Sequence, residues 1–557
     1  GTAFYYTGNN YSSFDQQAVS SWVSSTFGTT LPNLTLNMAS GSRLFIASDV
    51  EMNLSNTNAT NLFGSSSPTI IGTDYKTFML YLSRLKVNQS VNLDNSNDAY
   101  NQLEISNSSI DNNNNNIIKG SKIGQTAMAQ ENNSALYTRN KVELVNNGTI
   151  SLLGNSSTGM YAKFGVINNA GIITISDNST GVYGTENSIL SNTGKITIGS
   201  NSTGMYSEGS TTTNLVNAGT IESSGNGSIG LLYKPGTIAT ANAMLVNTGI
   251  INMTGDQNVA LYGTNMSGVT STYGISNSGT ITMGNSSSIN NPNVALYADG
   301  DTKSVSNSGT ITMGANTIGM YGHEASVTGG SLTVGDGGVG IYSQSRNVTL
   351  SGGTITVGGN EAVGVYTLGS GQNIINSGTS INIGNTSYGF VNVGTGNSIT
   401  SSLTNNTLGT SSLYIYSNDS SGRVINSTNL TSTGNQNYGI YSAGTVNNSG
   451  NMDLSSGVGN VGIYSVSGGT ATNTATISIG ASDIDNENNG IGMAAGIKGD
   501  LNSKPAKQSF SGNIINSGII NVNGKSSIGM YATESGSTVT NIGTINLNAD
   551  NTTGIFL

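Results

Sequence analysis

The side chains that could carry out chemistry are few in this chain, and the most regularly spaced of them lie near its C-terminal end. Asp483, Asp485 and Glu487 alternate like the first oxygen ligands of a calcium-binding loop. Such a loop needs a glycine at its sixth position and a glutamate at its twelfth, whereas this chain has Asn488 and Ala494 there. We therefore expect these residues to bind neither a metal ion nor any other cofactor.

Enzymatic catalysis also finds little support in the sequence. The chain has a single histidine, His323, and no cysteine, so it offers neither a histidine cluster nor a thiol nucleophile. A polysaccharide lyase or hydrolase needs two carboxylates, or a carboxylate beside Lys or Arg, gathered on one exposed face. Carboxylates such as Asp177, Glu222 and Asp256 are isolated in the sequence. We predict that the chain is not an enzyme and has no catalytic residues, with a polysaccharide-cleaving enzyme as the alternative.

The elements that would position a functional site follow from a repeat that is regular from Tyr137 onward. Each copy reads Asn-x-Gly-x-Ile, then a short polar stretch, then Gly-aliphatic-Tyr, as in Asn192–Ile196 followed by Gly204–Tyr206. Hydrophobic and polar residues alternate in about three short runs per copy, which indicates strands bounded by turns. A fixed period of roughly 23 residues is typical of a solenoid. We predict an all-β, right-handed parallel β-helix with three short strands per coil.

The positions within the repeat have different expected roles. The aliphatic residue before each tyrosine should be buried, stacking on its equivalent in the next coil. These residues are Met160, Val182, Met205, Leu232, Leu261, Leu296, Met320, Ile341, Val365 and Ile440. The asparagines should form a ladder of side-chain hydrogen bonds at a turn, and the glycine after each should supply a positive φ angle.

The repeated tyrosines should point outward, because side chains alternate along a strand and the residue before each tyrosine points inward. Two interpretations remain open. The rings could stack on one another and simply cover the strand face, or the outward stripe could bind sugar rings.

The sequence predicts two regions. Residues 1–100 should form an irregular N-terminal cap with a short helix over Asp15–Phe27, strands such as Leu34–Met38 and Phe78–Leu82, and some early coils behind them. Residues 101–557 should form the β-helix.

Departures from the period predict inserted loops at about 286–293, 391–437 and 481–512. The last repeat, Gly554–Leu557, has no polar cap to cover its open strand edge. We therefore expect the chain to be a fragment of a longer protein.

Charge excludes one class of partner. The formal net charge is −10, charged residues make up 8% of the chain, and Lys and Arg are scattered singly. No basic stripe is available for a phosphate backbone, so we predict no nucleic-acid binding. Binding should instead lie in the N-terminal region or in the loops that interrupt the repeat. The candidate ligand-binding residues are Trp22, Asp483, Asp485, Glu487, Lys498, Asp500, Lys504 and Lys507.

The repeats themselves resemble those of a known family. Asn217-Ala218-Gly219-Thr220-Ile221 and Asn201-Ser202-Thr203-Gly204-Met205-Tyr206 are similar to coils in the passenger domains of large fusobacterial type V autotransporter adhesins, such as RadD and the fusobacterial apoptosis protein. The resemblance implies export to the outer face of the outer membrane, behind a C-terminal β-barrel that this chain does not include. It further implies a monomeric passenger that binds a host glycan, a host receptor or a partner bacterium. A passive spacer stalk is the structural alternative.

Overall fold

The computed structural model describes residues 1–14, 25–26, 28, 33–54, 68–132, 142–210, 214–235, 242–264, 272–300, 304–496 and 511–557. The chain divides into two compact units. Unit 1 comprises Gly1–Met253 and Tyr262–Tyr273, and unit 2 comprises Thr254–Leu261 and Gly274–Leu557.

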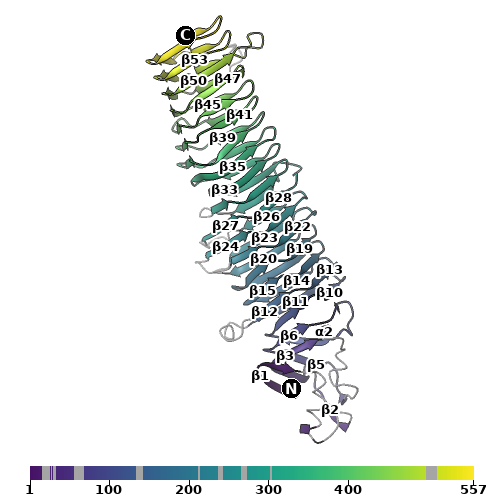
Figure 1. The fold of residues 1–557 in the computed structure, drawn as a ribbon. Coiled ribbons are helices and arrows are strands. Elements are labelled where there is room, and N and C mark those ends of the chain that lie inside the picture. Colours follow the sequence, from purple (N-terminus) through teal and green to yellow (C-terminus); the bar gives the residue numbers. More distant parts are fainter. Residues whose placement is uncertain are drawn as a thin grey trace. The chain divides into compact units, whose positions relative to one another are not determined.

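Both units are built from coils of three strands, each of which pairs in parallel with its equivalent in the neighbouring coils (Figure 1). One coil of unit 1 shows the pattern, with Ile167 of its first strand lying between Leu144 and Leu190 of the coils on either side. The strands therefore form three columns. We call them column 1, column 2 and column 3, in the order in which the chain passes through them within one coil. The predicted all-β parallel β-helix is confirmed.

The strands of unit 1 are as follows. Column 1 contains β6 (Arg84–Val87), β9 (Ser109–Asn112), β12 (Val142–Asn146), β15 (Gly165–Asn169), β18 (Ile189–Asn192), β21 (Asn214–Asn217) and β24 (Asn242–Asn247). Column 2 contains β10 (Ile117–Gly120), β13 (Thr149–Leu152), β16 (Ile172–Ile175), β19 (Lys195–Ile198), β22 (Thr220–Ser223) and β25 (Ile250–Met253). Column 3 contains β11 (Thr126–Glu131), β14 (Thr158–Lys163), β17 (Thr180–Thr185), β20 (Thr203–Ser210) and β23 (Ile229–Pro235).

Unit 2, taken by itself, has the same kind of arrangement. Column 1 contains β30 (Ser304–Asn307), β37 (Asn373–Asn376), β40 (Ser398–Ser401), β43 (Arg423–Asn426), β46 (Thr445–Asn448), β49 (Thr470–Asn473), β52 (Asn513–Asn516) and β55 (Thr538–Asn541). Column 2 contains β28 (Thr280–Met283), β31 (Thr310–Met313), β38 (Ser380–Ile383), β41 (Asn406–Leu408), β44 (Leu430–Ser432), β47 (Met452–Val458), β50 (Thr476–Ala481), β53 (Ile519–Val522) and β56 (Thr544–Leu547). Two long strands, β33 (Glu324–Val334) and β35 (Val348–Val357), run through both columns.

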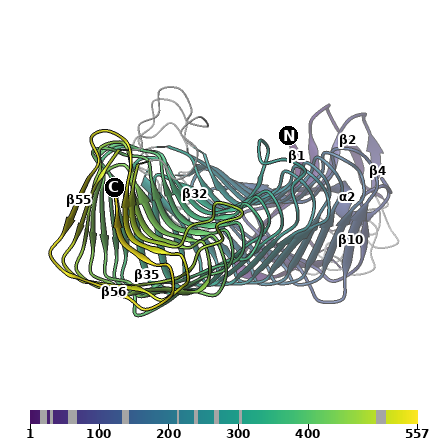
Figure 2. The same ribbon diagram turned by 90° about the horizontal axis from the view of Figure 1, so that it is seen from above.

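Column 3 of unit 2 forms the remaining face of its coils. Its strands are β29 (Asn293–Ala298), β32 (Thr317–Gly322), β34 (Val339–Ser343), β36 (Val363–Thr367), β39 (Tyr388–Asn392), β42 (Leu413–Ser417), β45 (Tyr438–Ser442), β48 (Val461–Ser465), β51 (Ile491–Ala495), β54 (Ile528–Ala532) and β57 (Thr553–Phe556). Figure 2 shows β55 and β56, which belong to columns 1 and 2, on different sides of a coil of unit 2.

The predicted core positions are buried, with one exception. Met160, Val182 and Met205 pair in register and are fully buried in column 3. Leu232 is only partly buried, so its assignment to the core is wrong. In β23 it is Leu231 that pairs with Met205, which shifts the following residue, Leu232, into the outward tyrosine position and buries the ring of Tyr233.

The predicted asparagine ladder is present. Asn146 donates to Asn169, Asn169 to Asn192, and Asn192 to Asn217, each amide nitrogen lying 2.7 Å from the next side-chain oxygen. Each of these side chains is buried. In unit 2 the ladder links Asn277 to Asn307, and Asn426 in turn to Asn448, Asn473, Asn516 and Asn541. The ladder partners are 22 residues apart at Asn426–Asn448 and 43 apart at Asn473–Asn516, so coil length varies while the corner stays constant.

The glycine beside each ladder asparagine has a different role from the one expected. None of Gly171, Gly194 and Gly219 has a positive φ. A β-carbon on Gly194 would lie 2.0 Å from the carbonyl oxygen of Gly171 in the preceding coil. Glycine is therefore required here because the neighbouring backbone occupies the space of a side chain.

Parallel pairing extends into the first 100 residues, where the sequence predicts a cap. The long strand β1 (Thr2–Phe14) pairs with β3 (Arg43–Leu54), which pairs in turn with β5 (Lys76–Tyr81). Phe4, Phe45 and Phe78 occupy the same register, and the rings of Phe45 and Phe78 stack 5.0 Å apart. The first coils thus use phenylalanine where later coils use aliphatic residues.

This region also contains short strands. Strands were expected at Leu34–Met38 and Phe78–Leu82, and the structure has β2 (Thr35–Asn37), paired with β4 (Thr69–Ile71), and β5 there. The predicted helix at Asp15–Phe27 lies outside the described residues apart from Ser25 and Thr26.

The sequence missed the short helix α2 (Ala99–Gln102), whose first turn is capped by Asp98. Two further strands, β7 (Val91–Asn92) and β8 (Leu103–Ser106), flank it. No helix in the part of the chain that the structure describes is both long and apolar enough to cross a membrane.

Residues 391–437 form regular coils, so the prediction of an inserted loop there is wrong. Val391 pairs with Tyr416 and Tyr416 with Tyr441 in column 3. The repeat is hard to see because different residues fill its corner. Ser401 replaces the ladder asparagine, and its hydroxyl lies 2.7 Å from that of the buried Tyr414.

Candidate functional site

The acidic loop that looks like a calcium site is a self-contained turn between β50 and β51. The backbones of Asp483 and Asn488 exchange two hydrogen bonds, at 2.8 and 2.9 Å. The Asp483 carboxylate accepts from the side-chain amide of Asn486 at 2.7 Å. Asp483 therefore shapes the loop, which lies at the start of the insertion expected at 481–512. Within that range Ile491–Ala495 form the regular strand β51 of column 3, so the prediction of a loop is wrong for those residues.

The other candidate residues are not brought together with Asp483. Asp485 and Glu487 are exposed on the tip of the loop. Trp22, Lys498, Asp500, Lys504 and Lys507 lie outside the described residues. Among the residues that are described, no three His, Asp or Glu side chains lie close enough to hold a metal ion.

The repeated tyrosines lie on the outer face of column 3 and stack on each other. In unit 1 the rings of Tyr183 and Tyr206 are 4.9 Å apart and nearly parallel. In unit 2 the rings of Tyr321, Tyr342 and Tyr366 stack at 5.0 and 5.2 Å. Each of these rings covers the face of the next, which favours the first of the two interpretations for these parts of the stripe. The rings of Tyr297 and Tyr321, by contrast, meet edge to face.

The stripe changes between β39 and β45. Its register there reads Tyr366, Val391, Tyr416 and Tyr441, so that a valine interrupts the tyrosines. A second outward row lies three residues earlier in each strand and reads Tyr388, Leu413 and Tyr438. In this row a leucine is placed between two larger aromatic rings.

A hollow of about 440 Å³ lies over that leucine, and we call it the tyrosine hollow. Its lining residues are Tyr388, Ser411, Ser412, Leu413, Tyr416, Gln436, Tyr438, Tyr441 and Asn488. Leu413 is 8% exposed and Tyr388 is 40% exposed, so the aromatic ring rises beside the shorter side chain. Asn488 is contributed by the loop that Asp483 closes, which gives that loop a positioning role.

The tyrosine hollow is neutral. Among the described residues that line it there is no Asp, Glu, Lys or Arg. Burial, together with the neighbouring Tyr416 and Tyr438, raises the pKa of Tyr441 to about 12, and burial raises the pKa of Tyr416 as well. Both hydroxyls are therefore protonated at neutral pH and able to donate hydrogen bonds.

One wall of the tyrosine hollow is held rigidly. Tyr438 and Tyr441 pack against a buried cluster on the outer face of column 3 that includes Val461, Tyr464 and Ile491. The loop is held closely too, because a β-carbon on Gly459 would lie 2.8 Å from the β-carbon of Asn488. The sequence signals that could have identified this place are the valine in the tyrosine column and the extra tyrosines that begin β39 and β45.

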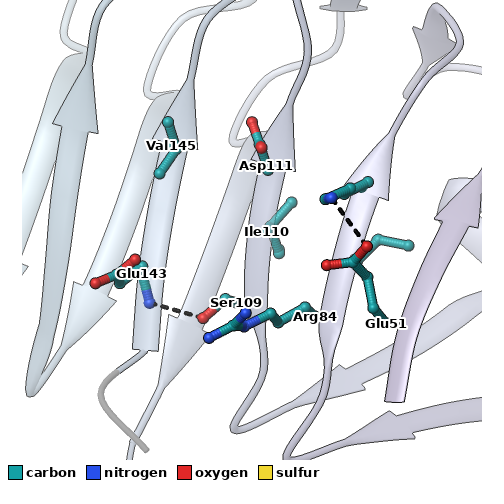
Figure 3. Close-up of a pocket in the computed structure, with 9 residues that line it drawn as sticks. Glu51, Arg84, Ser109, Ile110, Asp111, Glu143 and Val145 are labelled. Atoms are coloured by element: carbon teal, nitrogen blue, oxygen red, sulfur yellow. Dashed lines mark hydrogen bonds and ion pairs between the residues drawn. The ribbon is translucent and has the colours of Figure 1, made fainter. Parts of the chain in front are cut away.

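A second hollow, of about 260 Å³, lies on the outer face of column 1 in unit 1 (Figure 3), and we call it the charged groove. Glu51, Arg84 and Ser109 share one register on neighbouring strands, and Lys86 and Asp111 share the next. Glu143 follows on β12, where its backbone nitrogen donates to the hydroxyl of Ser109 at 3.0 Å.

The groups of the charged groove are partly paired. Lys86 Nζ lies 2.9 Å from Glu51 Oε1, as the dashed line in Figure 3 marks. The Arg84 guanidinium lies 4.0 Å from the centre of the Tyr11 ring. Burial raises the pKa of Asp111. The interpretation that the carboxylates are isolated is wrong for this face, because parallel pairing aligns strands that are distant in the sequence.

The loop expected at about 286–293 connects β28 to β29 and is held by hydrogen bonds to Asp256. The Asp256 carboxylate accepts from the Ser286 hydroxyl at 2.6 Å and from the Ser287 nitrogen at 3.1 Å. These bonds lower the pKa of Asp256 from about 3.8 to about 2. A carboxylate with a lowered pKa stabilises the folded loop above pH ~4, and that stabilisation is lost as the pH falls towards 2.

Replacing Asp256 with asparagine should loosen this loop at neutral pH. Amide hydrogen exchange of Ser286–Asn291 should become several-fold faster, and wild-type exchange should rise to the same level as the pH falls from 4 to 2 after correction for the intrinsic rate. Asp177→Asn, which removes a similar carboxylate that accepts from Ser200, is the matched control and should leave this loop unchanged. Equal protection of the loop in wild type and Asp256→Asn would contradict the assignment.

The family described as the BigA third pectate lyase-like domain matches residues 24–275 and 454–555 of the chain. No curated protein and no solved structure matches it.

Proposed function

The chain belongs to the BigA third pectate lyase-like domain family, and we propose that it is a ligand-binding passenger of a bacterial surface adhesin that acts without catalysis. BigA is an autotransporter-like adhesin, which supports a surface-exposed protein of this kind. The finer proposal is a monomeric, exported outer-membrane autotransporter passenger like those of the fusobacterial adhesins. Its partner would be a host glycan, a host receptor or another bacterium.

The observation that carries this proposal is the tyrosine hollow. It combines apolar ring surface with hydroxyl and amide groups, as binding sites for small ligands commonly do. Its described lining residues include no carboxylate, lysine or arginine that could act as a general acid or base near pH 7. Its composition therefore suits recognition better than bond cleavage.

Adhesion is tested with the full chain coupled to beads. The beads should retain host cells or partner bacteria, whereas beads carrying Leu413→Tyr, which fills the hollow with a larger ring, should retain at least tenfold fewer. Val339→Tyr places the same ring in the same row of column 3, further along unit 2, and should behave as wild type. If wild-type beads retain no cells, the passive spacer becomes the better account.

The charged groove supports a second candidate, a polysaccharide-cleaving enzyme. It gathers the carboxylates of Glu51, Asp111 and Glu143 beside Arg84 and Lys86, which is the arrangement that such an enzyme needs.

We expect no cleavage of neutral or acidic polysaccharides by the wild-type chain, measured as new reducing ends or unsaturated products. Polysaccharide cleavage would replace adhesion as the proposed function under three conditions. The wild-type chain forms product, Glu143→Gln and Arg84→Lys reduce the rate at least a hundredfold, and Glu222→Gln on the same unit does not reduce it.

A further inference from the structure

We infer that the tyrosine hollow is a subsite for one neutral pyranose ring, held over Leu413 between Tyr388 and Tyr438. The inference rests on the proposed adhesive function and names the chemical class of its ligand. It begins from the register of column 3, in which these three residues occupy equivalent positions on consecutive coils.

The spacing of the coils gives the subsite its width. Neighbouring strands lie about 4.8 Å apart, so Tyr388 and Tyr438, two strands apart, are separated by about 10 Å. That distance is too large for their rings to stack on each other directly, as the rings of adjacent coils do. Leu413 fills only the lower part of the space, which leaves room above it for one ring of a sugar.

The polar groups are placed around this apolar floor. The hydroxyls of Tyr388, Tyr416 and Tyr441 have no hydrogen-bond partner among the residues that the structure describes. Gln436 accepts from the Ser411 hydroxyl at 3.3 Å through its oxygen, which leaves its amide nitrogen available. A pyranose has an apolar face of C–H groups and an edge of hydroxyls, and it would use both kinds of surface.

Charge decides between classes of sugar. The lining residues that the structure describes include no cation to pair with the carboxylate of an acidic sugar, so burying that carboxylate there would be unfavourable. Nor do they include an anion to hold an ammonium group. A peptide partner with an aromatic side chain would use the rings but leave the hydroxyls and amides unpaired, which favours the sugar.

The size is also consistent with a small part of a glycan. A volume of about 440 Å³ is near the lower end of the range for ligand sites and suits a monosaccharide or disaccharide. An open site of this kind should bind one ring weakly, with a Kd on the order of 1 mM, so adhesion would depend on many copies at the cell surface.

In the experiment, the full chain is titrated with methyl glycosides of neutral hexoses and with methyl glucuronide, and binding is measured by saturation-transfer NMR. At least one neutral glycoside should bind, and the glucuronide should bind at least tenfold more weakly. Leu413→Tyr should reduce neutral glycoside binding at least tenfold, whereas the matched control Val339→Tyr should not change it. Gln436→Ala, a change to an exposed residue that leaves the fold intact, should weaken binding several-fold.

Three results would overturn the inference: no neutral glycoside binds wild type, the glucuronide binds as well as the neutral sugars, or Leu413→Tyr and Val339→Tyr behave alike. The outcome is separable from that of the proposed function. If beads still retain cells but no neutral glycoside competes, the adhesin stands and the pyranose subsite fails. Competition by a tyrosine-containing peptide instead would assign the hollow to a protein partner.

Discussion

Replacing Gly194 with alanine should destabilise the coils around it by at least about 3 kcal/mol. The new β-carbon would lie 2.0 Å from the carbonyl oxygen of Gly171 and 2.6 Å from the carbonyl carbon of Ala170. Neither atom belongs to a flexible side chain, so two paired backbones must separate. The same oxygen of Gly171 accepts the hydrogen bond from the nitrogen of Lys195, at 2.9 Å, and that bond would be lost.

The measurement should resolve individual coils, because a solenoid can open locally without unfolding as a whole. Hydrogen exchange followed by mass spectrometry should show lost protection in peptides of β16, β18 and β19. Gly358→Ala is the matched control, since a β-carbon there would meet only one side-chain methyl, at 4.0 Å. Equal protection in both variants would mean that the close approach of neighbouring coils does not require glycine at this corner.

Replacing Asn192 with leucine should cost about 2–6 kcal/mol, because it breaks the asparagine ladder in its middle. Asn192 accepts from Asn169 and donates to Asn217, both at 2.7 Å, in a corner from which water is excluded. Both neighbours would keep a buried polar atom without its ladder partner. Thermal unfolding and local hydrogen exchange should both report the loss.

Asn307→Leu provides the graded comparison, because Asn307 lies at an end of the ladder. Its side chain accepts from Asn277 but donates only within its own coil, to the carbonyl of Gly309 at 3.1 Å. The next two coils have Val327 and Leu350 at the equivalent place. Asn307→Leu should therefore cost about half as much as Asn192→Leu, and a larger effect would contradict the ladder account.

The sequence was sufficient to predict a residue's role where one physical requirement recurs in every coil. The aliphatic position before the tyrosine and the ladder asparagine are each repeated because each must stack on its own copy. The prediction failed at Leu232, where the strand carries two leucines before its tyrosine and the next coil selects Leu231 as the core residue. Pairing across coils, which one strand does not reveal, decides such cases.

The candidate sites were harder to predict, for a related reason. The charged groove joins Glu51, Arg84 and Glu143 from three strands that are separated in the sequence by at least one whole coil. The tyrosine hollow arises because Leu413 is smaller than its neighbours in the row, a difference that is visible only once the register is known. Of the predicted binding residues, Asp483 contributes by shaping the loop that carries Asn488.

The proposed sugar-binding site of this β-helix lies on the outer face of column 3. The crystal structure of the full chain in complex with a neutral methyl glycoside tests it most directly. We predict a pyranose ring over Leu413, flanked by Tyr388 and Tyr438, with the amide of Gln436 or Asn488 within hydrogen-bond distance of a sugar hydroxyl. A sugar bound along the charged groove of Glu51, Arg84 and Glu143, with the tyrosine hollow empty, would contradict the account.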